Sequence, residues 1–128
     1  MIMKENEISY VIRGCAFTVH KTLGPGLLES VYEAALKYEL KNAGMKIINQ
    51  LGVPMRYKEI KFDFGFRLDI LVDDLVVVEI KSVDSLLDIH HKQLLTYLKL
   101  MDMKLGILIN FNTLTLDNKS MVRIVNNL

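Results

Sequence analysis

Residues 66–81 read FRLDILVDDLVVVEIK and decide the fold, because two runs of aliphatic and β-branched residues flank the pair Asp73-Asp74. Consecutive aspartates favour a turn, so the runs 66–72 and 75–81 are predicted to form the two strands of a β-hairpin. The second run opens with four consecutive apolar residues, which is typical of a central strand covered on both faces. We therefore expect this hairpin to lie inside a larger sheet.

Periodicity predicts helices and further strands on both sides of the hairpin. Helices are expected over residues 6–22, from Leu27 to about Lys41, and over 86–102. Residues 46–49 and 53–59 have strand-like content before the hairpin, and strands are expected over 105–111 and 121–125. The expected inner stripe of the second helix consists of Leu28, Val31, Ala35 and Leu36. The order α-α-β-β-β-α-β-β predicts one α/β domain over residues 1–128, with a single central mixed sheet flanked by helices.

Composition limits the class of protein. With 51% hydrophobic and 24% charged residues, the 128-residue chain can bury one core and is not disordered as a whole. No apolar run is long enough to span a bilayer, so no membrane partner is expected. The one cysteine, Cys15, excludes an internal disulfide and a cysteine-based zinc site, and it indicates a cytoplasmic location. A formal net charge of +1 neither indicates nor excludes nucleic-acid binding.

Charged residues interrupt the apolar pattern near the ends of the hairpin strands. Glu79 and Lys81 are two residues apart on one strand and so share a face. A two-residue loop would turn Asp69 away from Glu79, whereas a three-residue loop over 73–75 would place their Cβ atoms about 5 Å apart. Facing carboxylates repel unless a cation lies between them, and their oxygens suit Mg²⁺ or Mn²⁺. The simpler interpretation is a surface ion pair between Glu79 and Lys81 on a solvated hairpin.

A second motif favours the metal interpretation. Residues 24–33 read GPGLLESVYE, in which Gly26, Glu29 and Tyr32 form the pattern G-x-x-E-x-x-Y. The chain resembles the GxxExxY proteins, a small family placed in the PD-(D/E)XK nuclease superfamily, and the resemblance implies a restriction-endonuclease-like core. It covers nearly the whole chain, through the segments HKTLGPG at 20–26, Arg67-x-Asp69, Glu79-Ile80-Lys81, QLLTYL at 93–98 and GILINFN at 106–112.

The resemblance implies a metal site with Mg²⁺, or Mn²⁺, as the cofactor. Asp69 and Glu79 correspond to the acidic metal ligands of the superfamily, and the backbone carbonyl of Ile80 would be a further ligand. Glu29 corresponds to an acidic residue of the first core helix, which would either ligate the metal or hold a water on it. The superfamily's motif usually has proline before the first acidic residue, and Leu68 stands there in this chain.

Two polar residues complete the implied catalytic set. Lys81 corresponds to the lysine that orients and helps to deprotonate the attacking water. Gln93 corresponds to a polar residue on the helix that follows the motif strand.

Four more residues are candidates for substrate binding, and each has a structural alternative. Tyr32 either orients a carboxylate or packs with a satisfied hydroxyl. Tyr97 follows Gln93 by one helical turn and either reaches the site or belongs to the amphipathic face. His20 either faces the cleft or stabilises the end of its helix. Arg67 is expected on the face of Asp69, where it either pairs with a carboxylate or reaches a phosphate.

The expected function is therefore a metal-dependent nuclease that hydrolyses phosphodiester bonds, with DNA or RNA as its partner. The alternatives are a catalytically inactive nuclease-fold module that binds nucleic acid or protein, and a structural domain whose charges form an ion-pair network. So small a domain has little surface for sequence-specific recognition of nucleic acid. A homodimer or a protein partner could supply that recognition. The deciding observation is whether the carboxylates of Glu29, Asp69 and Glu79 lie within about 6 Å of a common point.

Overall fold

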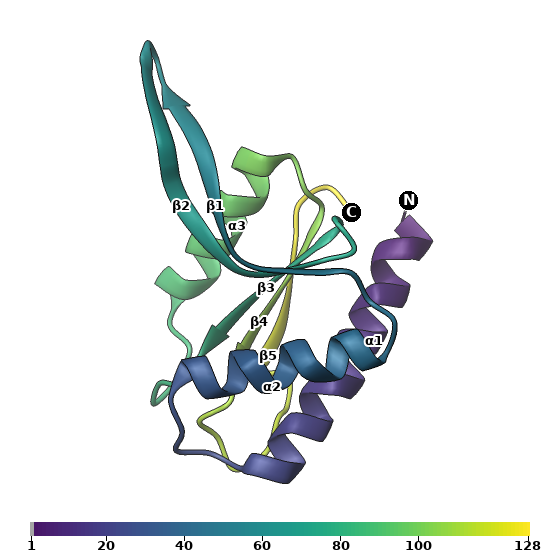
Figure 1. The fold of residues 1–128 in the computed structure, drawn as a ribbon. Coiled ribbons are helices and arrows are strands. Elements are labelled where there is room, and N and C mark those ends of the chain that lie inside the picture. The colour runs from purple at the N-terminus through teal and green to yellow at the C-terminus, as the bar shows by residue number, and fades with distance from the viewer. Residues whose placement is uncertain (1) are drawn as a thin grey trace.

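A five-stranded sheet lies between helices in the computed structural model, which describes residues 2–128 (Figure 1). The elements in chain order are α1 (Ile2–Leu23), α2 (Glu29–Asn42), β1 (Ile47–Tyr57), β2 (Ile60–Val72), β3 (Val76–Lys81), α3 (Asp88–Met101), β4 (Leu105–Asn110) and β5 (Met121–Val125). This order and the mixed sheet confirm the predicted fold class. Over the described residues, no helix combines the length and the apolar character that a membrane span requires.

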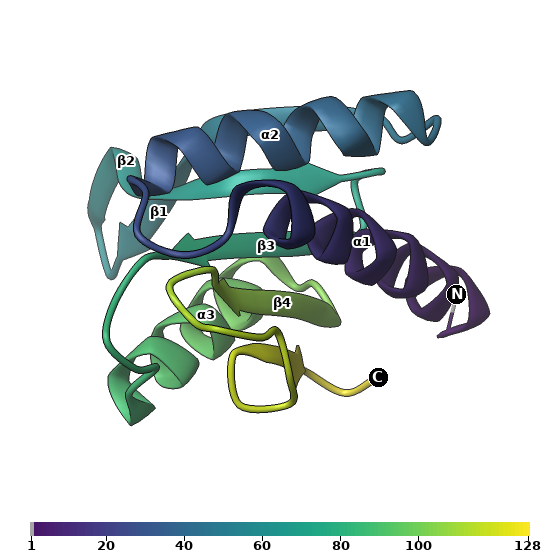
Figure 2. The same cartoon turned by 90° about the horizontal axis from the view of Figure 1, so that it is seen from below.

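The strands lie in the sheet in chain order, and all neighbours are antiparallel except β3 and β4. A parallel pair needs a crossover connection, which α3 supplies on one face of the sheet. Helices α1 and α2 cover the other face (Figure 2). The central strand β3 is buried along its length up to Lys81, as its apolar run predicts.

Alternation along β3 separates two hydrophobic clusters. Val76, Val78 and Ile80 pack with α1 and α2, whereas Val77 packs with Leu94 and Leu98 of α3.

Glu79 is two residues from Val77, so it points toward the α3 side of the sheet. The core thus sets the direction of the only acidic side chain on β3.

The hairpin between β2 and β3 has the three-residue loop. Val72 lies opposite Val76, which leaves residues 73–75 to make the turn. Asp73 and Asp74 adopt left-handed φ angles of 51° and 57°, which aspartate tolerates better than most residues. Of the two registers left open by the sequence, this one brings Asp69 opposite Glu79.

The inner stripe predicted for α2 is partly wrong. Its buried residues are Tyr32, Leu36 and Leu40. Leu28 is 73% exposed and Val31 is 41% exposed. The helix begins at Glu29, so Leu28 lies before its first turn, and the packed face follows an i, i+4 row that starts at Tyr32.

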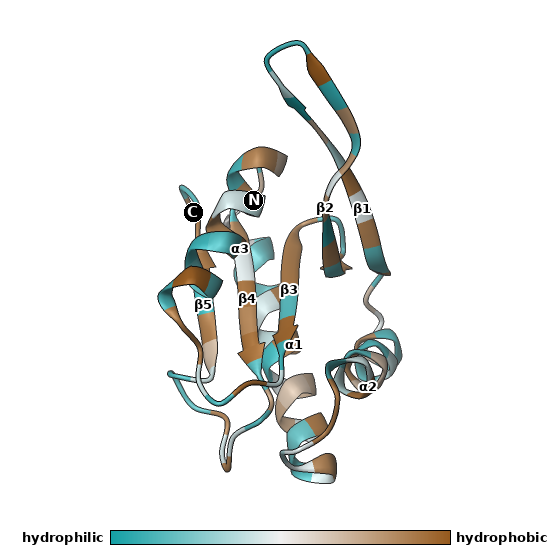
Figure 3. Cartoon of the chain, turned by 90° about the vertical axis from the view of Figure 1, so that its left-hand side faces the viewer, coloured by the Kyte–Doolittle hydropathy of each residue, from teal (hydrophilic) through white to brown (hydrophobic). Residues whose placement is uncertain are grey.

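Strands β1 and β2 extend well beyond the rest of the sheet as a two-stranded arm, residues 54–65 (Figures 1 and 3). The strand predicted over 66–72 is longer than expected, because β2 begins at Ile60. Residues 60–65 are all exposed, so this side of the arm carries no burial pattern from which a strand could be predicted. Pro54 lies where the register shifts between Val53 and Met55 on the edge strand β1, a position that tolerates proline.

Candidate functional site

Asp69 and Glu79 face each other where β2 and β3 separate. The two strands pair as far as Ile70 opposite Val78. At the next position the side chains replace the backbone ladder: the amide of Asp69 donates to Oε2 of Glu79 at 2.8 Å, and the amide of Ile80 donates to Oδ2 of Asp69 at 2.8 Å. Each carboxylate is therefore fixed to the opposite strand, beside the other acid.

Burial makes this pair electrostatically costly. Glu79 is 5% exposed, and burial, followed by the charge of Asp69, raises its pKa to about 8. Burial also raises the pKa of Asp69, and the hydrogen bond from the Ile80 amide offsets this only in part. At neutral pH and without a bound cation, Glu79 keeps its proton.

Lys81 supplies the positive charge nearest to this pair on the same strand. Its ammonium group lowers the pKa of both Asp69 and Glu79, although less than burial raises them. Within residues 2–128, no ion pair joins Lys81 to Glu79. Because Glu79 is also buried, the simpler interpretation of a solvated surface ion pair does not describe this hairpin.

The start of α2 lies against the end of β3. The amide of Ser82 donates to Oε2 of Glu29 at 3.4 Å, and the Ser82 hydroxyl donates to the carbonyl of Leu27 at 2.7 Å. The charge of Glu29 raises the pKa of Asp69. Glu29 is thus close enough to act on the pair through its field.

The expected convergence of three carboxylates on one ion is not seen. Among the described side chains, no three from histidine, cysteine, aspartate and glutamate gather in a way that could hold a metal. The reason is local: Asp69 and Glu79 accept hydrogen bonds across their two strands, whereas Glu29 accepts one from Ser82. Two carboxylates form the centre of the site, and Glu29 stands beside them.

Two residues that the sequence did not single out belong to the same neighbourhood. The charge of Glu33 raises the pKa of both Asp69 and Glu79. Its Oε1 accepts a 2.7 Å hydrogen bond from Nε2 of Gln50, which lies opposite Asp69 in β1 with a left-handed φ of 53°. The i, i+4 spacing of Glu29 and Glu33 was a usable signal, whereas nothing local marked Gln50.

Tyr97 lies close enough to the acidic pair to be affected by its charge. Burial and then the charges of Glu79 and Asp69 raise its pKa. Its ring stacks on Phe66 with centroids 4.4 Å apart, which fixes the ring on the α3 side of β2. Gln93, one turn earlier on α3, is exposed, and its side chain makes no hydrogen bond within the described residues.

Tyr32 and His20 have structural positions. Tyr32 is fully buried, and its hydroxyl donates to the carbonyl of Gly24 at 2.6 Å and accepts from the amide of Leu27 at 3.1 Å. Of its two alternatives, the structure has the packed tyrosine, out of reach of a substrate. Nε2 of His20 lies 2.7 Å from the carbonyl of Thr113, so this ring ties the end of α1 to the loop after β4.

Arg67 is exposed, but its expected place on the face of Asp69 does not follow from this structure. Leu68 packs in the cluster under α3, whereas Ile70 packs in the cluster under α1 and α2. Strict alternation would put both on one face. The alternation therefore breaks at Asp69, opposite the left-handed Gln50.

Asn110 at the end of β4 holds the chain that follows Lys81. It is 3% exposed, and its side chain accepts from the amide of Val83 at 3.1 Å and donates to the Val83 carbonyl at 2.9 Å. A polar residue at the end of an apolar strand was the available signal. Asn110 thereby fixes the direction in which the chain leaves the candidate site.

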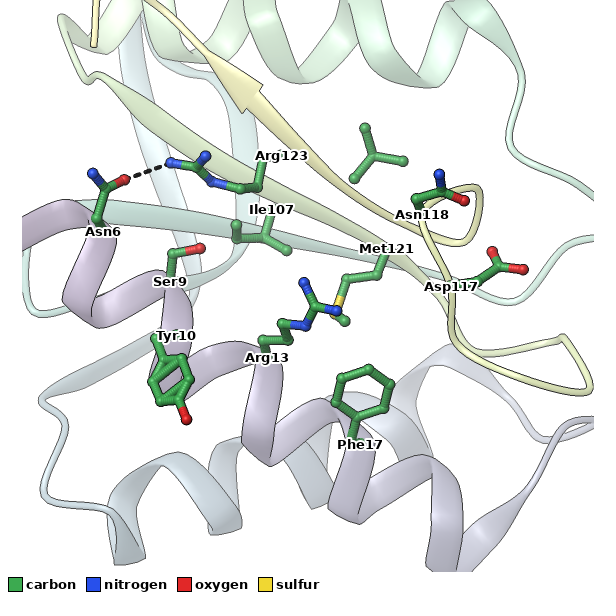
Figure 4. Close-up of a pocket in the computed structure, with 11 residues that line it drawn as sticks. Asn6, Ser9, Tyr10, Arg13, Phe17, Ile107, Asp117, Asn118, Met121 and Arg123 are labelled. Carbon is green, nitrogen blue, oxygen red and sulfur yellow. Dashed lines mark hydrogen bonds between the residues drawn. The ribbon is translucent and has the colours of Figure 1, made fainter.

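A cavity of about 510 Å³ lies elsewhere, between α1 and β5, with Arg13 and Phe17 on one side and Met121 on the other (Figure 4). A shallower depression of about 400 Å³ lies at the start of α2, between Glu29 and Ser82.

The residues present fit a hard divalent cation. Asp69 and Glu79 bring two carboxylates together, and Glu29 and Glu33 add negative charge that Lys81 does not balance. Carboxylate and carbonyl oxygens are the ligands that Mg²⁺ and Mn²⁺ prefer. A cation at this position would relieve the repulsion that raises the pKa of Glu79.

Comparison with known proteins points to the same chemistry. The family model described as PD-(D/E)XK nuclease superfamily matches residues 6–124 of the chain. Neither the curated proteins nor the solved structures gave a match. The matched range includes every residue of the candidate site.

Proposed function

Because the chain belongs to the PD-(D/E)XK nuclease superfamily, we propose that it is a metal-dependent nuclease that hydrolyses phosphodiester bonds in DNA or RNA. The observation that carries the proposal is the buried, facing pair of Asp69 and Glu79 beside the charge of Lys81. Within the superfamily, the G-x-x-E-x-x-Y pattern at 26–32 favours the GxxExxY proteins.

Each part of the site has a proposed role. Asp69, Glu79 and the carbonyl of Ile80 would hold Mg²⁺, or Mn²⁺. When bound, the ion would stabilise the negative charge that develops on the phosphoryl oxygens and would acidify the attacking water. Lys81 orients that water and favours its loss of a proton through its positive charge.

The neighbouring polar residues orient water and substrate. Glu29 and Glu33 of α2 lie close enough for their charges to act on the pair and would accept hydrogen bonds from ordered water. Tyr97 and Gln93 lie one turn apart on α3 and would contact the substrate near the scissile phosphate. Arg67 is exposed beside the site and would contact a phosphate farther along the strand.

The test begins with metal binding, measured by titration calorimetry with Mn²⁺ and Mg²⁺. Asp69→Ala and Glu79→Ala should each weaken binding at least tenfold, whereas the control Glu7→Ala, an exposed residue of α1, should not. Cleavage of labelled single- and double-stranded DNA and RNA then tests the enzyme. Lys81→Ala should abolish turnover with metal affinity unchanged or tighter, because the lysine charge opposes cation binding. Unchanged metal affinity in both aspartate and glutamate variants would remove the metal site.

One observation favours the alternative of an inactive binding module. The described part of the chain gathers no third carboxylate around the pair, and backbone amides already satisfy one oxygen of each acid. Retention of nucleic acid without cleavage, under conditions in which metal binds, would favour this alternative.

A further inference from the structure

The arm, residues 54–65, is the part of the molecule that the candidate site does not explain. It projects past α3 from the end of the sheet (Figure 1) and mixes apolar and polar residues along its length (Figure 3). Its large apolar side chains are unusually exposed: Tyr57 57%, Ile60 54%, Phe62 42% and Phe64 77%. Aromatic rings in water, on an element that supports no core, indicate contact with another molecule.

The ring of Phe64 packs against the backbone of Gly52 on the neighbouring strand. A Cβ atom built on Gly52 would lie 2.2 Å from this ring, so the ring occupies the space that a side chain at position 52 would fill. Most of the ring nevertheless faces solvent. A ring held against the backbone with its remaining surface open is a preformed platform, which loses little conformational entropy when another planar group stacks on it.

Two cations lie directly opposite each other on the same arm. Arg56 pairs with Lys61 across the two strands, and like charges in that position destabilise a hairpin. Among the residues that the structure describes, neither has an ion-pair partner. An anionic partner would remove this repulsion. The arm as a whole carries Arg56, Lys58 and Lys61 against Glu59 and Asp63, a formal charge of +1, so it is this facing pair of cations that favours a polyanion.

We propose that the arm binds unpaired nucleic acid, with a base stacked on Phe64 and phosphates beside Arg56 and Lys61. Exposed aromatic rings interleaved with basic residues are the features by which proteins hold single strands, because every base has a flat face. The bases of a duplex are already stacked and offer Phe64 no such face. A second copy docked arm to arm would bring the cations of both arms together, which the charges disfavour.

The arm is continuous with the candidate site, and this part of the inference rests on the proposed function. Phe64 and Asp69 lie on the same strand, β2, five residues apart. At about 3.3 Å per residue, the two positions are at most roughly 17 Å apart along the strand. A single strand held on the arm would therefore be the substrate presented to the acidic pair.

The test measures binding in EDTA, where cleavage does not occur. Fluorescence anisotropy with labelled oligo(dT), oligo(U) and a duplex of equal length distinguishes DNA, RNA and paired substrates. Phe64→Ala should weaken single-strand binding at least about fivefold, the loss of one stacked base. Phe64→Leu keeps an apolar side chain over Gly52 but removes the aromatic ring on which a base could stack, so it should bind single strands as weakly as Phe64→Ala.

Further variants distinguish the contribution of the Phe64 ring to binding from that of the two cations. Gly52→Ala should displace the ring and weaken binding in the same way, because the ring is an exposed side chain that can move. Arg56→Gln with Lys61→Gln should weaken binding and lower its salt dependence. Tyr10→Ala is the matched control, since Tyr10 of α1 is also 77% exposed, and it should change nothing.

A spectroscopic reading tests stacking directly. The chain contains no tryptophan, so Phe64→Trp introduces a single reporter whose fluorescence should fall when oligo(dT) or oligo(U) binds. The control Tyr10→Trp should show no such quenching. Unchanged affinity of Phe64→Ala, or an unquenched tryptophan at position 64, overturns the proposal. Arm-dependent dimers in analytical ultracentrifugation, without nucleic-acid binding, also overturn it.

Failure of this inference and failure of the proposed function are distinguishable. If Asp69→Ala abolishes cleavage while Phe64→Ala binds single strands normally, the arm proposal fails and the nuclease stands. If Phe64 controls binding but no nucleic acid is cleaved with any metal, the nuclease fails and the arm remains a single-strand binding surface.

Discussion

The backbone amide of Asp69 donates a 2.8 Å hydrogen bond to the carboxylate of Glu79 on the neighbouring strand. The same peptide segment therefore supplies both a stabilising donor and a repelling charge to Glu79. Burial and the Asp69 charge together outweigh the donor, and they raise the pKa of Glu79 to about 8. The metal-free protein thus carries an electrostatic strain that depends on pH.

Replacing Glu79 with glutamine should stabilise the metal-free protein at high pH. The glutamate is neutral in both the folded and the unfolded protein below about pH 4.5, its ordinary pKa. Between about pH 4.5 and 8 the unfolded protein releases this proton while the folded protein keeps it, so wild-type stability falls over this range, by on the order of a few kcal/mol in total, and levels off above it. The Tm of Glu79→Gln in EDTA should therefore exceed that of wild type increasingly from pH 5 to about 8 and by a constant amount above that.

The matched control is Glu59→Gln, at the exposed turn of the arm. Its Tm should follow wild type at every pH. A constant difference between Glu79→Gln and wild type across that range would show that Glu79 titrates normally.

Metal binding should become more stabilising as pH rises. At pH 6 Glu79 holds a proton that a cation must displace, whereas at pH 9 the site is ionised and the cation relieves its repulsion. The increase in Tm caused by Mn²⁺ over EDTA, measured by scanning calorimetry, should be larger at pH 8.5 than at pH 6. An equal increase at both values, or one retained by Asp69→Ala, would contradict a site at this pair.

Substitutions of Gln50 should change the activity and the stability of the protein in different ways. Its left-handed φ of 53° costs a non-glycine residue roughly 1 kcal/mol, and its side chain fixes Glu33. Gln50→Gly relieves the backbone strain but frees Glu33, so urea unfolding should give unchanged or slightly higher stability while kcat falls several-fold with KM little changed.

Gln50→Ala keeps the strain and loses the hydrogen bond, and it should be less stable than Gln50→Gly. If Gln50→Gly cleaves as well as wild type, the contact with Glu33 has no part in the reaction.

Tyr32→Phe should destabilise the fold by about 1–2 kcal/mol. The change removes a hydroxyl that joins the Gly24 carbonyl to the Leu27 amide, and it leaves buried polar groups without their partner. The ring remains stacked on Phe111, 4.7 Å away between centroids. Urea unfolding of Tyr32→Phe should shift, whereas Tyr38→Phe, 63% exposed on the same helix, should match wild type.

Local patterns were sufficient for the order of elements. The run from Leu75 to Val78 predicted the buried central strand, and the 3.6-residue period predicted the helices, because both depend on neighbours close in the chain. The prediction covered one strand of the arm, over 53–59, but missed the other for the same reason, since residues 60–65 bury nothing and so show no period. The face of α2 was misjudged because Leu28 lies before the helix begins.

The sequence by itself determined which charged residues end the apolar strands, and it predicted Asp69, Glu79 and Lys81 as candidate site residues. Only the tertiary structure decided the three-residue loop, the buried pair it creates, and the separate position of Glu29 beside Ser82. It alone brought Gln50 of β1 to Glu33 of α2. The physical reason is that the two kinds of information depend on residues at different separations in the chain. The periods of strands and helices are set by residues close in sequence, whereas the distances between side chains on different elements are set by how the whole core packs.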